Sequence, residues 1–179
     1  MKWITPVLVL IMIAAVVGIS GCTNTGASAQ QTYSNGSIKF NYPSGYQTAT
    51  PPGKLSSGPT SWIDVTFLAN SNSTAIEVEK NNQVKDPSVA REATDAFTNS
   101  TSGVSMSNVS HTTETNPNGM KIFKSTYTLK DSDGTVKYID LYFKDKHGIV
   151  YCISVFNVES SYQDVSDTAN TIFNSLSLN

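Results

Sequence analysis

The sequence predicts an α+β fold, a single domain in which an antiparallel β-sheet is flanked by helices. Two observations predict it. Most of the chain after residue 33 alternates apolar and polar residues in short runs separated by turns, the pattern of half-buried strands. Two stretches, 87–98 and 160–176, instead carry apolar residues at helical spacing. Strands joined by tight turns pair antiparallel, and amphipathic helices need a sheet face to cover.

The first half of the chain supplies three predicted strands. They are expected at 37–42, 62–68 and 74–80. In the first strand Ile38, Phe40 and Tyr42 share one face, and Pro43 ends the run. A loop rich in proline and glycine, 50–59, separates this strand from the second.

A helix is predicted directly after these strands, from 87 to about 98. Asp86 is a residue type that caps helix N-termini, and Pro87 suits the first helical position. An apolar stripe is expected to face the sheet, formed by Val89, Ala90, Ala93, Ala96 and Phe97.

The second half begins as a meander of strands. The strand at 104–113 is polar, so it should be exposed. The strands at 120–129 and 136–143 are joined through Asp133-Gly134, a hairpin signal. The strand at 149–156 is apolar on both alternating faces, so we expect it at the centre of the sheet, covered on both sides.

A second helix is predicted to close the chain. Ser160 and Gln163 have the spacing of a capping box at its start. Its apolar side is formed by Tyr162, Val165, Ala169, Ile172, Phe173 and Leu176. The sequence therefore predicts two amphipathic helices, each with an apolar side that can cover a face of the sheet.

The first 21 residues have the pattern of a lipoprotein signal peptide. An apolar run starts beside Lys2 and ends at Ser20 and Gly21, the small residues that a signal peptidase needs next to the bond it cleaves. Cys22 follows directly, and its thiol is the expected attachment point for lipid. The sequence therefore predicts a signal peptide at 1–21 and a protein that is lipid-anchored on the extracytoplasmic face of the cell membrane.

An uncleaved N-terminal membrane helix is the alternative. Residues 4–21 are almost continuously apolar, close to the roughly 18 residues at which a membrane span becomes plausible. Thr5 and Pro6 interrupt the start of this run, and the small residues at its end favour cleavage. Both readings place the rest of the chain outside, because Lys2 keeps the N-terminus inside. The intact mass of the purified protein separates them, since retention of residues 1–21 contradicts a cleaved lipoprotein.

Residues 22–32 are expected to form a lipidated, flexible tether, followed by one folded domain at 33–179. The tether segment is small and polar and has nothing to bury. The whole chain has 12 basic and 14 acidic residues, which provide no basic surface for nucleic acid. The expected partners are thus the membrane, through the lipid at Cys22, and an unidentified envelope protein or surface component. Cys152 lies in an apolar run and is expected to be buried.

Two segments resemble PsbP-like domains. In the first, 38–46, an aromatic and aliphatic strand runs into Tyr42-Pro43, a small turn and an aromatic, here Tyr46 where Trp is usual. The second, 165–176, ends in Thr-Ile-Phe-Asn-Ser-Leu and is similar to the closing helix of the family. The order of elements between them also fits, so the resemblance spans 33–179.

The resemblance implies an α/β/α sandwich without catalytic activity. The plant members of the family are non-enzymatic extrinsic subunits that assist photosystem II, and related lipoproteins of bacteria and methanogenic archaea occur outside that context. No residue of this chain matches the metal sites of the photosynthetic members, so the resemblance assigns no metal and no cofactor here.

Four Asn-x-Ser/Thr sequons lie in the exported part of the chain. Their asparagines are Asn35, Asn72, Asn99 and Asn108. A chain rich in Asn, Ser and Thr produces such triplets by chance, yet all four fall at predicted turns, element ends or the polar strand, where a glycan fits. We expect partial glycosylation if the host is an archaeon with a surface oligosaccharyltransferase.

The sequence contains no convincing catalytic or metal-binding motif. His111 and His147 are not spaced as metal ligands, and there is no Gly-x-Ser-x-Gly elbow. The segment 131–134 begins like a calcium loop but lacks the required spacing, so a hairpin turn explains it better. Glu77 and Glu79 share one face of a strand, which alternation predicts to be a solvent face.

Three functional classes follow from these observations. The leading expectation is a tethered, non-catalytic domain that binds or supports another cell-envelope component, through a surface beside the loop 50–59 and the aromatics Tyr46 and Trp62. The alternative is a lipoprotein that binds a small ligand or an ion, although one domain lacks the second lobe that closes over a transported solute. An enzyme is the least favoured class, because no nucleophile has a base near it in the sequence.

Overall fold

The computed structural model describes residues 29–50, 62–71, 74–132, 134–158 and 162–179. Its strands are β1 (Gln30–Ser34), β2 (Ile38–Pro43), β3 (Gln47–Thr48), β4 (Ile63–Ala69), β5 (Thr74–Asn81), β6 (Ser105–Thr115), β7 (Lys121–Lys130), β8 (Thr135–Lys144), β9 (Val150–Val158) and β10 (Ser177–Leu178). Its helices are α1 (Pro87–Ser100) and α2 (Tyr162–Ser175). The predicted order of strands and helices is confirmed, and β1, β3 and β10 are additional short strands.

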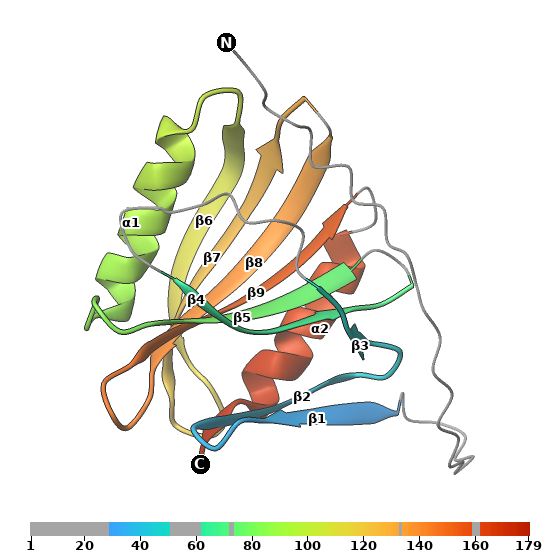
Figure 1. Cartoon of the computed structure of the whole chain (residues 1–179), viewed down its shortest axis with the longest axis vertical. Helices are drawn as coiled ribbons and strands as arrows, with labels where there is room; N and C mark the ends of the chain where they lie inside the picture. Colours follow the sequence, from blue (N-terminus) through green and yellow to red (C-terminus); the bar gives the residue numbers. More distant parts are fainter. Residues whose placement is uncertain (1–28, 51–61, 72–73, 133, 159–161) are drawn as a thin grey trace.

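The strands form two antiparallel sheets. The larger has seven strands in the order β3-β4-β5-β9-β8-β7-β6, and the smaller has three in the order β1-β2-β10. Figure 1 shows α1 beside β6, whereas α2 lies between the large sheet and the strands β1 and β2. The two helices cover opposite faces of the large sheet, so the predicted α+β sandwich is confirmed.

The larger of the two cores lies between the large sheet, α2 and the small sheet. Ile38 and Phe40 of β2, Ile153 of β9 and Ile172 of α2 are fully buried in it. As the alternating pattern predicts, β9 is central and contributes buried residues to both faces, with Cys152 in the smaller core on the side of α1. The capping-box residue Ser160 lies outside the described residues.

The ordered body begins earlier than the sequence pattern predicts. Tyr33 is the expected first residue of the domain, but β1 already pairs with β2 from Gln30, whose Cα partner is Pro43. Polar residues are accommodated there because β1 is an edge strand with little burial. Strand β1 therefore includes three residues, 30–32, of the segment predicted as tether.

Helix α1 begins as predicted but turns a different side to the sheet. Asp86 caps it by accepting a hydrogen bond from the backbone N–H of Ser88, and Pro87 occupies the first position. The predicted apolar stripe is wrong at two positions, because Val89 is 51% exposed and Ala96 is also exposed. Asp95 instead reaches the sheet, which is polar at this place, as described below.

Strand β6 forms one edge of the large sheet and is exposed, as its composition predicts. Its pairing with β7 shifts register between Ser107 and Ser110, and Asn108 within this bulge has a φ of 54°. Asparagine is one of the few residues other than glycine that adopt this conformation readily. A bulge of this kind twists an edge strand away from unwanted pairing with another sheet.

Neither helix in the described part of the chain has the length and apolarity needed to cross a membrane. The predicted signal peptide and Cys22 lie outside the described residues.

Candidate functional site

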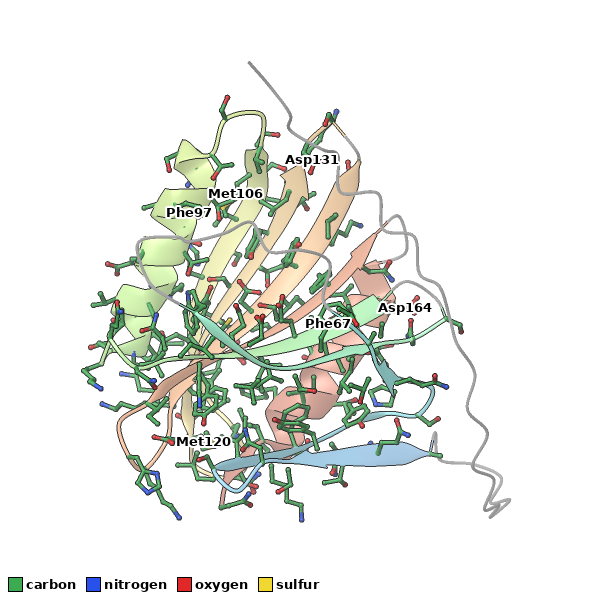
Figure 2. The ribbon with its side chains drawn as sticks, in the orientation of Figure 1. Phe67, Phe97, Met106, Met120, Asp131 and Asp164 are labelled. Atoms are coloured by element: carbon green, nitrogen blue, oxygen red, sulfur yellow. The ribbon has the colours of Figure 1, made fainter. Side chains whose placement is uncertain are left out.

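An open groove lies at the end of the large sheet where the C-terminus is found. It has a volume of about 580 Å³, and we call it the base groove. Its lining residues are Asp86, Pro87, Asn118, Gly119, Met120, Lys121, Phe123, Lys144, Ser177 and Leu178. They come from the start of α1, the turn between β6 and β7, the ends of β7 and β8, and β10. Figure 2 labels Met120 at this end of the molecule.

One wall of the base groove is the β6–β7 turn, which the buried Asn116 holds in place. The Asn116 amide donates hydrogen bonds to the carbonyls of Phe173 and Leu176, at 3.0 and 2.7 Å. Its oxygen accepts from the backbone N–H groups of Asn118 and Met120, at 3.1 and 2.9 Å. The Asn118 amide adds a second bond to Leu176, at 3.0 Å. These bonds satisfy carbonyls at the end of α2 and fix the turn to it.

The opposite wall is the capped start of α1. The Asp86 carboxylate accepts hydrogen bonds from the N–H and the hydroxyl of Ser88, at 2.8 and 2.7 Å. These bonds, together with the nearby charge of Lys144, lower the pKa of Asp86 below its ordinary value. The one carboxylate that lines the groove is therefore ionised at neutral pH and already occupied in capping the helix.

The apolar surface of the groove is formed by Pro87 of α1, Met120 of the β6–β7 turn, Phe123 of β7 and Leu178 of β10. Phe123 is half-buried, and Leu178, which is 37% exposed, comes from β10. Cations lie over the Phe123 ring, with Lys121 Nζ at 5.0 Å and Arg91 Cζ at 5.9 Å from its centroid. The groove thus combines apolar surface with positive charge.

A group of carboxylates lies on another part of the same sheet face. Asp64 of β4 is directly opposite Glu79 of β5, and their ligand oxygens and those of Glu77 lie within 4.8 Å of one another. Carboxylate oxygens are the ligands that calcium and magnesium prefer. Alternation along β5 predicts that the two glutamates share a face, but Asp64 joins them through strand pairing, which their spacing in the sequence does not reveal.

Beneath α1, the structure brings together a serine, a histidine and an aspartate. Ser125 Oγ lies 3.1 Å from His111 Nδ1, and His111 Nε2 lies 3.2 Å from the carboxylate of Asp95 on α1. Sequence reasoning missed this arrangement because its members are on β7, β6 and α1. Ser125 is fully buried in the middle of a strand, so its hydroxyl is closed to a substrate. The arrangement therefore ties α1 to the sheet.

Asp140 lies beside this arrangement and is also buried. Its carboxylate accepts hydrogen bonds from the hydroxyls of Tyr127 and Tyr142, at 2.7 and 3.0 Å. Burial outweighs these bonds and raises the pKa of Asp140 to about 6. Cys152 is buried next to it, as predicted, and burial raises the pKa of the thiol well above its ordinary value. A thiol that stays protonated is a poor nucleophile.

The two aromatics predicted to bind a partner are not brought together. Tyr46 is 4% exposed in the larger core, where its hydroxyl lies 3.1 Å from that of Thr168. Trp62 is half-buried in the smaller core, with its ring 6.1 Å from Tyr142. The two cores lie on opposite sides of the large sheet, and residues 51–59 of the intervening loop are outside the described residues. Tyr46 and Trp62 therefore do not form one binding surface.

The remaining predicted sites that fall within the described residues lie on the surface. Asn35, Asn99 and Asn108 are exposed, in a turn, at the end of α1 and in the bulge of β6, so glycan attachment there stays a prediction. Asn72 is outside the described residues. The His147 side chain is 62% exposed in the turn between β8 and β9.

No protein-family model and no curated protein sequence matches this chain. Among solved structures, it is similar to the solution structure of cyanobacterial PsbP (CyanoP) from Synechocystis sp. PCC 6803, with a TM-score of 0.60 and 13% sequence identity, over 89% of this chain and 98% of that chain. The chain therefore has the PsbP-like fold, as its resembling segments predict. A weaker likeness, with a TM-score of 0.47 and 13% identity over 84% of this chain and 90% of the other, is to LpqN, which is involved in cell envelope biogenesis of Mycobacterium tuberculosis.

Proposed function

We propose that this chain is a membrane-tethered, extracytoplasmic module that binds another component of the cell envelope and does not catalyse a reaction. The base groove carries the proposal. It is open, and its walls are fixed by the hydrogen bonds of Asn116 and Asp86. A pre-formed groove that mixes apolar surface with a few polar groups is typical of binding sites. Tethering itself follows from the predicted lipid at Cys22.

The chemistry of the groove favours binding over catalysis. Its polar side chains are two lysines, an asparagine, a serine and an aspartate that is occupied as a helix cap. Proton transfer needs a group whose pKa lies near the working pH, and the pKa of Asp86 is shifted away from it. Ser125 and His111 resemble a nucleophile with its base. They do not line the groove, however, and the buried Ser125 hydroxyl is closed to substrates.

Crosslinking in native membranes tests this function with two matched variants. Leu178→Asp places a charge on the apolar surface of the groove. Val109→Asp places the same charge outside the groove, at a similarly exposed apolar residue of β6. We expect Leu178→Asp to reduce the yield of the crosslinked component at least tenfold, because it replaces apolar contact surface with a carboxylate that must lose its water when the component binds. Val109→Asp should keep it. Equal yields for wild type and both variants would contradict binding through the groove.

A second function, ion binding, is favoured by the carboxylates of Asp64, Glu77 and Glu79. We expect 10 mM calcium to raise the melting temperature by about 3–10 °C, if the site binds like those of extracellular modules with Kd of about 0.1–1 mM. The measurement is thermal unfolding with and without calcium. Asp64→Asn should abolish the increment, and Glu92→Gln, which removes an exposed carboxylate of α1, should keep it. An increment that survives Asp64→Asn would contradict this site.

A further inference from the structure

We propose that the base groove binds an amphiphile with one apolar chain and an anionic head group, such as a carboxylate or a phosphate. This inference deepens the proposed function and rests on it, because it names the chemistry of the component that the same groove binds. It is carried by three features of the described residues: two lysines in one groove, an apolar surface beside them, and walls that are already formed.

The two lysines lie at the same end of neighbouring strands. The pairing of β7 with β8 ends at Phe123 and Tyr142, and Lys121 and Lys144 are the residues two positions beyond that pair in each strand. Both lysines line the groove and are exposed. Two like charges in one groove repel each other. An anion between the two ammonium groups relieves this repulsion and accepts charge-assisted hydrogen bonds from both.

The charges around these lysines do not neutralise them. Within the described residues neither ammonium group forms an ion pair. Asp86, which lowers the local positive charge, is held by Ser88 at the helix cap. Arg91 also lies at the ring of Phe123, but it does not line the groove and is itself 4.0 Å from the carboxylate of Glu92. The groove is thus positive on a chain whose formal net charge is −2.

The apolar chain of the ligand has a matching surface beside the cations. Met120, Phe123 and Leu178 line the groove together with the buried Pro87. A volume of about 580 Å³ falls within the range of sites that bury small ligands, about 300–1,000 Å³. The hydrogen bonds of Asn116 hold Met120 in position without a ligand, so binding does not have to order this wall.

Methionine methyl signals provide a direct test in the purified full-length protein. Met120 lies in the groove, whereas Met106 lies at the far end of the β6–β7 pair, as Figure 2 shows. The methionine methyl groups are labelled with 13C, and each signal is assigned by replacing its methionine with leucine. The protein is then titrated with dodecanoate, dodecyl phosphate, dodecyltrimethylammonium or dodecyl maltoside, each below its critical micelle concentration. We expect a saturable shift of Met120, but not of Met106, with the anionic probes alone. Dodecanoate and dodecyl phosphate separate a carboxylate from a phosphate preference.

Matched double variants test the role of the lysines. Lys121→Gln with Lys144→Gln should weaken binding of the anionic probe at least tenfold. Lys124→Gln with Lys130→Gln removes the same charge from residues that alternation puts on the other face of β7, and should leave binding unchanged. No saturable Met120 shift, equal binding of the cationic or neutral probe, or equal weakening by both double variants overturns the proposal.

The two proposals fail in different ways. If neither anionic probe binds but Leu178→Asp still loses its crosslinked component, the amphiphile is overturned and the binding module stands. If an anionic probe binds through the lysines but Leu178→Asp is crosslinked like wild type, the amphiphile site stands and binding of the envelope component through the groove is overturned.

Discussion

Replacing Asp140 with asparagine should remove a pH-dependent loss of stability of roughly 3 kcal/mol. The folded state raises the pKa of this buried carboxyl from 3.8 to about 6, mainly through desolvation. Below pH 3.8 the group is protonated in both states and costs nothing. Between pH 3.8 and about 6 the unfolded state loses the proton while the folded state keeps it, so stability falls; above about 6 both states are ionised and the loss stays constant.

Urea unfolding of wild type and Asp140→Asn between pH 4 and pH 8 measures this effect. Across this range the unfolding free energy of wild type should fall relative to that of the variant by about 2.5 kcal/mol, nearly all of it below pH 7. Taking the difference cancels the titration of the groups that the two proteins share. Asp131→Asn, in an exposed turn, is the control and should show no comparable change. A constant difference for Asp140→Asn would contradict a raised pKa at this residue.

Asn116→Ala should lower the unfolding free energy by about 2–4 kcal/mol. Asn116 is 4% exposed and makes four hydrogen bonds, two to carbonyls at the end of α2 and two to backbone N–H groups of the β6–β7 turn. The substitution leaves the carbonyl of Phe173 and the N–H groups of the turn without their partner. Chemical denaturation measures the loss, and the Met120 methyl signal should broaden as the groove wall loosens.

Asn118→Ala is the matched control for this prediction. Asn118 lies in the same turn and is exposed, and its side chain makes one hydrogen bond to Leu176. Its loss should cost about 1 kcal/mol or less. Equal destabilisation by the two substitutions would show that Asn116 is not the residue that fixes the wall.

The regular elements of the fold are predictable because they depend on short-range patterns. Alternation, turn residues and the Asp86-Pro87 cap act over a few neighbouring residues and specify strands, hairpins and the start of α1. The buried side of α1 is not predictable in this way. An apolar stripe through Val89 assumes an apolar sheet, whereas the sheet presents His111 and Asp140 there, and Asp95 turns toward them.

The candidate site is largely hidden from the sequence. Lys121 and Lys144 become neighbours only through strand pairing, and Leu178 joins them through the last strand. Tyr46 and Trp62 are large aromatics near a long loop, so they resemble binding residues, yet both pack into cores. Two local signals do mark the groove: the Asp86-Pro87 cap, and the turn 116–119, Asn-Pro-Asn-Gly, whose first asparagine holds the groove wall.

Strand β2 receives one of its two partners from the very end of the described chain. Ser177 of β10 pairs with Lys39, 138 residues away in the sequence, and Leu178 pairs with Ile38. Leu176, which directly precedes β10, is fully buried in the larger core with Ile38. Contacts between residues so far apart form slowly, so we expect the small sheet to be completed late in folding, after the hairpins of the large sheet.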